Sequence, residues 1–426
     1  MGRDCQIGTR KNKIKRISFV MGDFSQNGII STLHDFGTRS TSEIEKDLLK
    51  FSEERKMELI LPCLYSELEG SALPKIVDEI SKTKYLDHII VGLDKANETQ
   101  AKKAWKFFKK LKTPFSLLWN EGPGLKKLDQ ELKRKDLSPN ELGKGRNVWY
   151  CIGMSIARDT ARSVALHDCD IKTYDRRMLA KLFYPVVNPL FNFEFCKGYY
   201  PRVANGKMNG RVARLLVFPL LTALEKTIGK SDYLNFMKSF KYPLAGEFSF
   251  RRNVLPELRI SSDWGIEVGI LSEMQRSFSP QNICQVDLAD TYDHKHQVLS
   301  IDDETKGLSR MSIDIIKTFI KKLATQGNSF SREKFRSLKA TYYRSALDLI
   351  DIYRTDAYMN GLEFDSHTEE KAVELFAMNI MKAGEAFILN PMDTPFIPTW
   401  SRVKSAIPDF LGRLEKVVND DNKKHS

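Results

Sequence analysis

The residues best suited to chemistry form the string HDCD, His167 to Asp170, which follows an apolar run from Val164. Two carboxylates flanking one residue at the end of a buried strand lie where α/β proteins bind ligands. Carboxylate oxygens suit Mg²⁺ or Mn²⁺, ions that commonly bridge protein carboxylates and substrate phosphates. The alternative interpretation is that Asp168 and Asp170 only cap the following turn. Spacing alone does not separate the two.

Three further segments favour a site. GKGRN opens a predicted helix, so that Lys144 and the first backbone N–H groups are placed to hold an anion. LAGEFSFRR puts Glu247 inside an otherwise apolar strand, where an ionised carboxylate must be paired or functional. DHKH brings His294 and His296 together in a short segment after the apolar run ICQVDL. A lone histidine is usually structural, but two so close together weaken that interpretation.

The elements that must position these residues follow an alternating pattern. Apolar runs predict strands, and stretches of helical spacing lie between the first of them; this alternation is typical of a parallel α/β sheet. The predicted strands are 57–64, 86–93, 115–119, 164–168, 193–200, 244–250 and 283–288, and the predicted helices are 72–82, 98–112, 211–228, 264–275 and one from about 145. From about residue 305 onward the spacing is helical throughout. We therefore expect a basic, flexible tail at 1–20, an α/β domain at 21–300, a mainly helical region at 301–418 and a flexible tail at 419–426.

The composition of the 426 residues excludes several classes of protein. Lys and Arg total 67 against 55 Asp and Glu, a net charge of +12, which suggests an anionic partner without specifying it. The Lys-rich stretch 102–112 has its apolar residues at helical spacing, so it predicts a solvated helix face rather than a nucleic-acid site. Six scattered cysteines without a CxxC pair indicate reduced thiols rather than a zinc site or a disulfide framework. With no apolar run of membrane-spanning length and no secretory signal, we expect a soluble, cytoplasmic protein.

Seven segments in order carry a resemblance to a known family. They are PCLYSE (62–67), GKG (143–145), DCD (168–170), NGRV (209–212), PLAGEFSFRR (243–252), DWGIEVGIL (263–271) and DHKHQ (293–297). This set resembles the glucosyl-3-phosphoglycerate synthase family over roughly residues 57–300. The resemblance implies a GT-A fold, a Rossmann-like nucleotide-sugar domain. It also implies retaining transfer of glucose from UDP-glucose to 3-phosphoglycerate with Mg²⁺ or Mn²⁺.

The resemblance also implies roles for particular residues. The metal ligands are Asp170 and His294, with His296 as a possible substitute for the latter. The nucleotide sugar is contacted by Pro62, Leu64, Ser66 or Glu67, Asp94, Lys144, Asp168 and Cys169. The acceptor is held by Gly210 and Arg211, with His296 nearby. The catalytic residues are Glu247, beside the transferred sugar, together with Asp170 and Lys144.

Several alternatives remain open from the sequence. The family usually continues the acceptor loop as G-R-V-T-E, whereas this chain has Ala213 and Arg214. The acceptor is therefore either 3-phosphoglycerate or free glycerate, and the donor either UDP-glucose or GDP-mannose, which would make a glucosyl- or mannosylglycerate synthase. A catalytically silent, basic scaffold protein is the alternative from another class. We expect no nucleic-acid partner and, from the resemblance, a homodimer.

Overall fold

A central sheet of eight strands organises the computed structural model, which describes residues 26, 28–139, 141–294, 307–391 and 396–425. The strand order is β1-β10-β6-β9-β5-β2-β3-β4. The strands are β1 Ser31–Leu33, β2 Met57–Leu64, β3 Leu86–Asp94, β4 Phe115–Trp119, β5 Ser163–Leu166, β6 Phe195–Tyr199, β9 Phe248–Arg251 and β10 Ile283–Asp287. A separate two-stranded hairpin pairs β7 Val203–Ala204 with β8 Lys207–Met208.

One strand of the sheet runs against the others. β9 is antiparallel to both neighbours, β5 and β6, whereas the remaining pairs are parallel. The start of β9 therefore lies at the edge of the sheet where β5 and β6 end. This reversal brings residues that precede β9 together with residues that follow β5.

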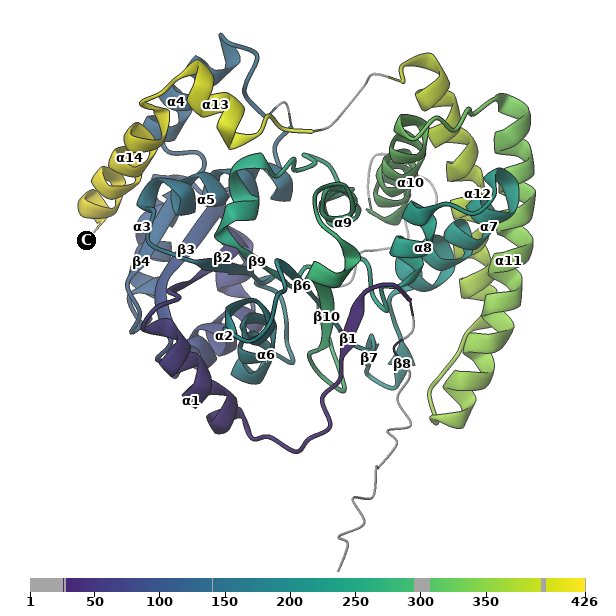
Figure 1. The fold of residues 1–426 in the computed structure, drawn as a ribbon, viewed down its shortest axis with the longest axis horizontal. Helices are drawn as coiled ribbons and strands as arrows, with labels where there is room; N and C mark the ends of the chain where they lie inside the picture. The colour runs from purple at the N-terminus through teal and green to yellow at the C-terminus, as the bar shows by residue number, and fades with distance from the viewer. Residues whose placement is uncertain (1–25, 27, 140, 295–306, 392–395, 426) are drawn as a thin grey trace, which may run out of the picture.

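The side chains of the strands alternate between two cores because successive residues of a strand point to opposite faces. In β2, Leu59 and Leu61 belong to one buried cluster and Ile60 belongs to the other. The first cluster is covered by α1 Thr41–Ser52, α2 Ala72–Ile80, α3 Glu98–Phe108 and α6 Arg176–Val187. The second is covered by α4 Pro123–Lys133, α5 Lys144–Arg158, α7 Phe218–Ile228, α8 Asp232–Lys238 and α9 Ile266–Ser277. The result is a three-layer arrangement (Figure 1).

A group of long helices extends the second core away from the sheet. These are α10 Gly307–Thr325, α11 Arg332–Met359 and α12 Ser366–Leu389, which lie beside α7 and α8 in Figure 1. Phe319, Tyr342 and Phe376 belong to the same buried cluster as α5 and α7. The hydroxyl of Tyr342 also donates to the carbonyl of Leu215 at 2.5 Å. The helical region and the sheet are therefore one packed body.

The end of the chain packs against the sheet. We expected a helical region at 301–418, and the last helices, α13 Trp400–Ala406 and α14 Phe410–His425, return to the sheet next to α3, α4 and α5 (Figure 1). Trp400 stacks on Trp149 of α5 with ring centroids 4.0 Å apart. We also expected a flexible tail at 419–426, but α14 continues to His425. The side-chain oxygen of Asn422 accepts a hydrogen bond from the backbone N–H of Leu117 at 3.1 Å. Polar composition was misleading because these polar groups are buried with partners.

The predicted strands are all confirmed, with bounds shifted by a few residues, as is the α/β order of the first half. Helices α1, α4, α6 and α8 and the short strands β1, β7 and β8 were not predicted. The predicted tail at 1–20 lies outside the described residues. Ala101, Trp105, Phe108 and Leu111 are buried as predicted for the Lys-rich stretch. Among the described residues, no helix is both long and apolar enough to cross a membrane.

Candidate active site

The candidate site lies where β5 ends and β9 begins. Asp168 and Asp170 follow β5, and Glu247 immediately precedes β9, so the antiparallel direction of β9 brings them to the same edge. Gly246 allows this approach, since a Cβ atom there would lie 2.3 Å from Oδ2 of Asp168. Glu247 thus shares one edge of the sheet with Asp168 and Asp170, although it is far from them in the sequence.

Lys144 provides the positive charge among these carboxylates. It is the first residue of α5, and its Nζ lies 2.6 Å from Oδ1 of Asp168 and 3.1 Å from Oε1 of Glu267. Burial raises the pKa of Asp168, but the charge and hydrogen bond of Lys144 outweigh burial and hold it below its ordinary value. Gly145 lets α5 begin here, because a Cβ atom would lie 2.1 Å from the carbonyl oxygen of Ser261.

Asp170 and His294 form a second pair beside the first. Oδ2 of Asp170 lies 3.6 Å from Nδ1 of His294, and both side chains are about one-quarter exposed. Burial, together with the negative charge of Asp168, raises the pKa of Asp170 to about 7. A carboxylate and an imidazole that meet at an accessible position, with surplus negative charge nearby, match the donor atoms that Mn²⁺ or Mg²⁺ takes from proteins.

Glu247 is completely buried and held by two tyrosines. Its Oε2 accepts a hydrogen bond from Tyr200 at 2.6 Å, and its Oε1 accepts one from Tyr292 at 2.8 Å. The two tyrosine rings are stacked, 3.5 Å between centroids. Below them Lys197, also fully buried, donates to the carbonyl of Ala245 in the turn before Glu247. Burial raises the pKa of Glu247, and the paired hydroxyls fix the direction of its carboxyl group.

The predicted donor-binding residues follow the ends of β2 and β3. Pro62 and Leu64 are in β2, and Ser66 and Glu67 are in the short 3-10 helix Tyr65–Glu69 that follows it. Glu67 is close enough to Asp170 to contribute to the raised pKa of Asp170. These residues therefore lie at the same edge of the sheet as the metal pair.

Asp94, the last residue of β3, is 8% exposed. Burial and the charge of Glu121 raise its pKa to about 6. Its carboxyl group is therefore largely screened from water at the end of the strand.

Cys169, a predicted donor contact, faces away from its two acidic neighbours. The side chain of Cys169 is 3% exposed and belongs to the core beneath the sheet. Successive residues of an extended segment point to opposite sides, so Asp168 and Asp170 face the site while the thiol between them faces the core. His296 lies outside the described residues.

Gly210 ends the loop after β8, and Arg211 begins the helical segment that continues through the π-helix Val212–Val217 into α7. Gly210 has φ +75°, a conformation that glycine adopts without strain. Nε of Arg211 lies 2.7 Å from Oε1 of Glu369 in α12, and Nη2 of Arg214 lies 2.9 Å from Oε2 of the same carboxylate. Arg202 joins this loop to the Glu247 cluster: its carbonyl accepts from the N–H of Asn209 at 2.6 Å, and its guanidinium lies 5.7 Å from the centroid of the Tyr292 ring.

Comparisons with known proteins identify the family. Glucosyl-3-phosphoglycerate synthase of Persephonella marina is 42% identical over 402 residues, covering 94% of this chain and 99% of the relative. The enzyme of the same name from Methanococcoides burtonii is 36% identical over 407 residues, covering 95% and 99%. The chain belongs to the glucosyl-3-phosphoglycerate synthase family. It is thus an enzyme of the glycosyltransferase class that uses a nucleotide sugar. No family model matches the sequence.

Solved structures confirm the fold class. The Mycobacterium tuberculosis glucosyl-3-phosphoglycerate synthase in complex with Mn²⁺, UDP-glucose and phosphoglyceric acid has a TM-score of 0.50 at 22% identity, covering 69% of this chain and 88% of that one. Mannosyl-3-phosphoglycerate synthase from Rubrobacter xylanophilus has a TM-score of 0.51 at 19% identity, covering 70% and 83%. At these identities the likeness shows the fold, and the predicted GT-A fold is confirmed.

Four residues of the site in this family member were missed by sequence reasoning. They are Tyr200, Tyr292, Glu267 and Glu369. Glu267 stands in the quoted segment DWGIEVGIL, so a charged residue in an apolar helix was an available signal. The tyrosines and Glu369 carried none, because their contacts join residues 45 to 158 positions apart.

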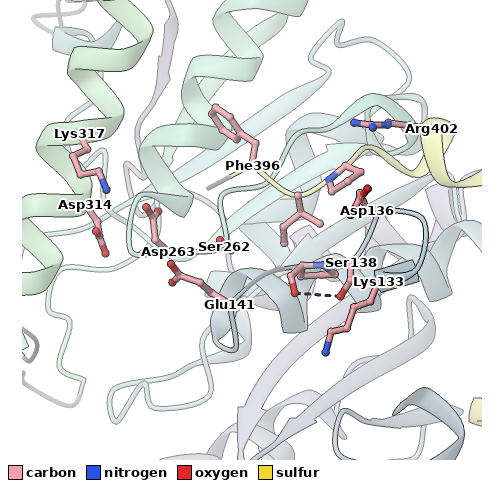
Figure 2. Close-up of a pocket in the computed structure, with 13 residues that line it drawn as sticks. Lys133, Asp136, Ser138, Glu141, Ser262, Asp263, Asp314, Lys317, Phe396 and Arg402 are labelled. Atoms are coloured by element: carbon pink, nitrogen blue, oxygen red, sulfur yellow. Dashed lines mark hydrogen bonds between the residues drawn. The ribbon is translucent and has the colours of Figure 1, made fainter. Parts of the chain in front are cut away.

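A cavity of about 380 Å³ lies beside the site rather than within it. Figure 2 shows Lys317, Asp314, Asp263 and Glu141 on one side of it and Asp136, Lys133 and Arg402 on the other. None of the predicted site residues that the structure describes lines this cavity. The site is better defined by the clustered side chains at the edge of the sheet.

Proposed function

We propose that this enzyme transfers glucose from UDP-glucose to 3-phosphoglycerate with retention of configuration, forming glucosyl-3-phosphoglycerate. One observation carries the proposal: in a member of this family, five side chains meet at one edge of the sheet. They are Asp168, Asp170, His294, Lys144 and Glu247. Two near-full-length relatives bear the corresponding name. A structural neighbour holds Mn²⁺, UDP-glucose and phosphoglyceric acid together.

We assign the divalent metal, Mn²⁺ or Mg²⁺, to Asp170 and His294. No cluster of three or more His, Cys, Asp or Glu side chains suited to a metal occurs in the described part of the chain. A pair of protein ligands leaves the other coordination positions to substrate oxygens and water, which is the usual arrangement for ions that bind nucleotide diphosphates. When bound, the ion supplies charge neutralisation for the leaving diphosphate.

Lys144 stabilises negative charge on the leaving diphosphate, and Glu247 stabilises positive charge on the sugar. Lys144, held by Asp168 and Glu267, presents an ammonium group where negative charge grows on the leaving diphosphate. The sugar passes through a state with oxocarbenium character. Glu247 is fully buried and fixed by two tyrosine hydroxyls, so its negative field can stabilise positive charge on a nearby sugar without rearranging, whereas direct contact with the sugar would require its cover to move.

The segment at Gly210 and Arg211 is suited to bind an anionic acceptor. A guanidinium group binds a carboxylate or phosphate through two parallel hydrogen bonds, so Arg211 suits phosphoglycerate at either of its charged ends. Arg214, where the chain departs from the family pattern, is 7% exposed and donates to the carbonyls of Met208 and Asn209. It therefore supports the loop rather than changing the chemistry offered to the acceptor.

A product assay tests this proposal directly. UDP-glucose and GDP-mannose are each combined with 3-phosphoglycerate and with glycerate, with Mn²⁺ or Mg²⁺ or with a chelator. We expect the metal-dependent product of UDP-glucose and 3-phosphoglycerate to dominate. A dominant glycerate or mannose product would replace the assignment with one of those substrates, and no product from any combination would favour a silent scaffold.

A single substitution tests the assignment of Asp170 as a metal ligand. Asp170→Ala is expected to reduce transfer at least a hundredfold and to abolish metal-dependent UDP binding in calorimetry. The matched control is Asp420→Ala, on the exposed face of α14 far from the site in sequence. Its activity is expected to equal that of the wild type. Full activity in Asp170→Ala would refute the metal ligand.

A further inference from the structure

Glu369 connects the C-terminal helices to the loop of the acceptor arginine. It lies in the first turn of α12, outside the segment of family resemblance, and is 3% exposed. Its two carboxylate oxygens are divided between two guanidinium groups, 2.7 Å from Nε of Arg211 and 2.9 Å from Nη2 of Arg214. A buried carboxylate is costly unless it is paired and hydrogen-bonded, and here each oxygen has its own cation.

The same helices hold the rest of the loop. Arg214 donates through Nε to the carbonyl of Asn209 at 2.9 Å, and its guanidinium lies 4.9 Å from the centroid of the Tyr353 ring in α11. The N–H of Glu363, in the turn between α11 and α12, donates to the carbonyl of Gly206 at 2.8 Å. The hairpin β7–β8 and the residues after it are therefore held by the C-terminal helices as well as by Arg202 on the side of the sheet.

This arrangement constrains how Arg211 can bind a ligand. Glu369 occupies Nε, and the terminal amino groups of Arg211 have no hydrogen bond to any described residue. The Arg211 side chain is 36% exposed. A guanidinium held through Nε keeps its two terminal amino groups as a planar fork, the geometry that matches two oxygens of a phosphate or carboxylate.

We propose that Glu369 is a positioning residue for the acceptor: it orients Arg211 so that the terminal amino groups receive an anionic group of phosphoglycerate. The inference rests on the proposed function, since it takes the acceptor to bind at Arg211. It assigns the C-terminal helices a direct part in acceptor recognition. Because Glu369 already orders the arginine, less conformational entropy is lost when the acceptor binds.

The test compares the Michaelis constants of the two substrates. Glu369→Gln keeps the volume but removes the charge, and we expect it to raise KM for 3-phosphoglycerate about threefold to tenfold while KM for UDP-glucose stays within twofold. Because Gln leaves Arg214 with an unmatched buried charge, a second variant, Arg214→Met/Glu369→Met, removes both buried charges together. It should raise the acceptor KM tenfold or more. Glu374→Gln, exposed on the same helix, is the control and should match the wild type.

Metal-dependent UDP binding, measured by calorimetry, verifies that each variant is folded. A purely structural role would change both Michaelis constants or the amount of active enzyme, whereas positioning changes the acceptor constant alone. An unchanged acceptor KM in the double variant overturns the inference and leaves the proposed function standing. A wild-type enzyme that transfers nothing to 3-phosphoglycerate overturns both.

Discussion

Burial alone would raise the pKa of every carboxyl group in the site, but the observed direction of the shift differs from residue to residue because their partners differ. Lys144 holds the pKa of Asp168 low, whereas the pKa values of Asp170 and Glu247 are raised by burial and by the charge of Asp168. Lys144 and Asp168 thus form a stable ion pair, whereas a bound cation would stabilise the charged forms of Asp170 and Glu247. This separation of roles is what a site for a metal and a diphosphate requires.

Asp94 provides a residue-scale prediction about pH. Its native pKa of about 6 exceeds the ordinary value of 3.8 because it is buried, so between these pH values the native state binds more protons than the unfolded state. Stability therefore falls as pH rises through this window. A shift of about two pH units corresponds to about 3 kcal/mol, so Asp94→Asn should be more stable than the wild type at pH 7 by up to this amount. Urea unfolding at pH 4 and pH 7 measures it.

The gain in Asp94→Asn should become small at pH 4, where the native carboxyl group is almost fully protonated and the unfolded one is close to half protonated. The same variant should bind UDP more weakly if Asp94 contacts the base. A variant that is less stable than the wild type at pH 7 would show that the buried carboxylate is compensated by its neighbours.

The turn before β9 lies so close to Asp168 that only glycine fits at position 246. Gly246→Ala would place a Cβ atom against the carboxylate of Asp168, so the carboxylate or the turn must move away. We expect transfer to fall at least tenfold, with a loss of about 1–3 kcal/mol in unfolding free energy as in other overpacked sites. Gly412→Ala is the matched control because nothing lies within 4 Å of its Cβ position in α14. It should retain activity and gain up to about 1 kcal/mol from helix propensity.

Equal activity of Gly246→Ala and Gly412→Ala would mean that the contact between the turn and Asp168 does not matter for transfer. Activity assays and urea unfolding on both variants decide between the outcomes.

The last helix protects the edge of the sheet. β4 is an edge strand, whose unpaired backbone groups need covering, and Asn422 of α14 accepts the buried N–H of Leu117. Asn422→Ala should cost about 1–3 kcal/mol because this donor would lose its partner. Asn419→Ala, exposed on the same helix, should change stability by less than about 0.5 kcal/mol. Thermal unfolding compares the two, and similar midpoints would contradict the edge-covering role of α14.

At the scale of the whole molecule, the sheet and the helical region share one core. A single buried cluster extends from α5 through α7 to α10, α11 and α12, and Trp400 adds the end of the chain to it. We therefore predict one cooperative unfolding transition, with coincident midpoints from fluorescence and far-ultraviolet circular dichroism. Two separated transitions would indicate that the helices unfold as an independent domain.

Association of whole molecules is a separate prediction. The homodimer expected from the family resemblance stays a prediction, which sedimentation of the full chain checks at several protein concentrations. A single monomeric species at all of them would contradict it.

Much of the fold was predictable because it depends on local patterns. Apolar runs predict β2, β3 and β4 within a residue or so, because a buried strand requires consecutive apolar side chains. Helices α4 and α6 were missed, since a charged residue with a partner lies on the buried face of each, as Lys181 of α6 does with Asp35. The polar end of α14 was misjudged for the same reason. Helix α1 was missed although its buried residues Ile44 and Leu48 have helical spacing.

The sequence by itself determined the alternating α/β order, the identity of the chemical groups and, through ordered motifs, the family. The tertiary structure decided which groups meet: the reversal of β9 that places Glu247 beside Asp168, the tyrosines that hold Glu247, and the carboxylate of Glu369 that holds Arg211. Local composition indicates which apolar residues are buried, because their burial depends on each side chain's own affinity for water, whereas a polar residue such as Glu369 is buried only where the fold supplies partners. Pairing of charges across 100 or more residues depends on the path of the whole chain, and no local pattern contains that path.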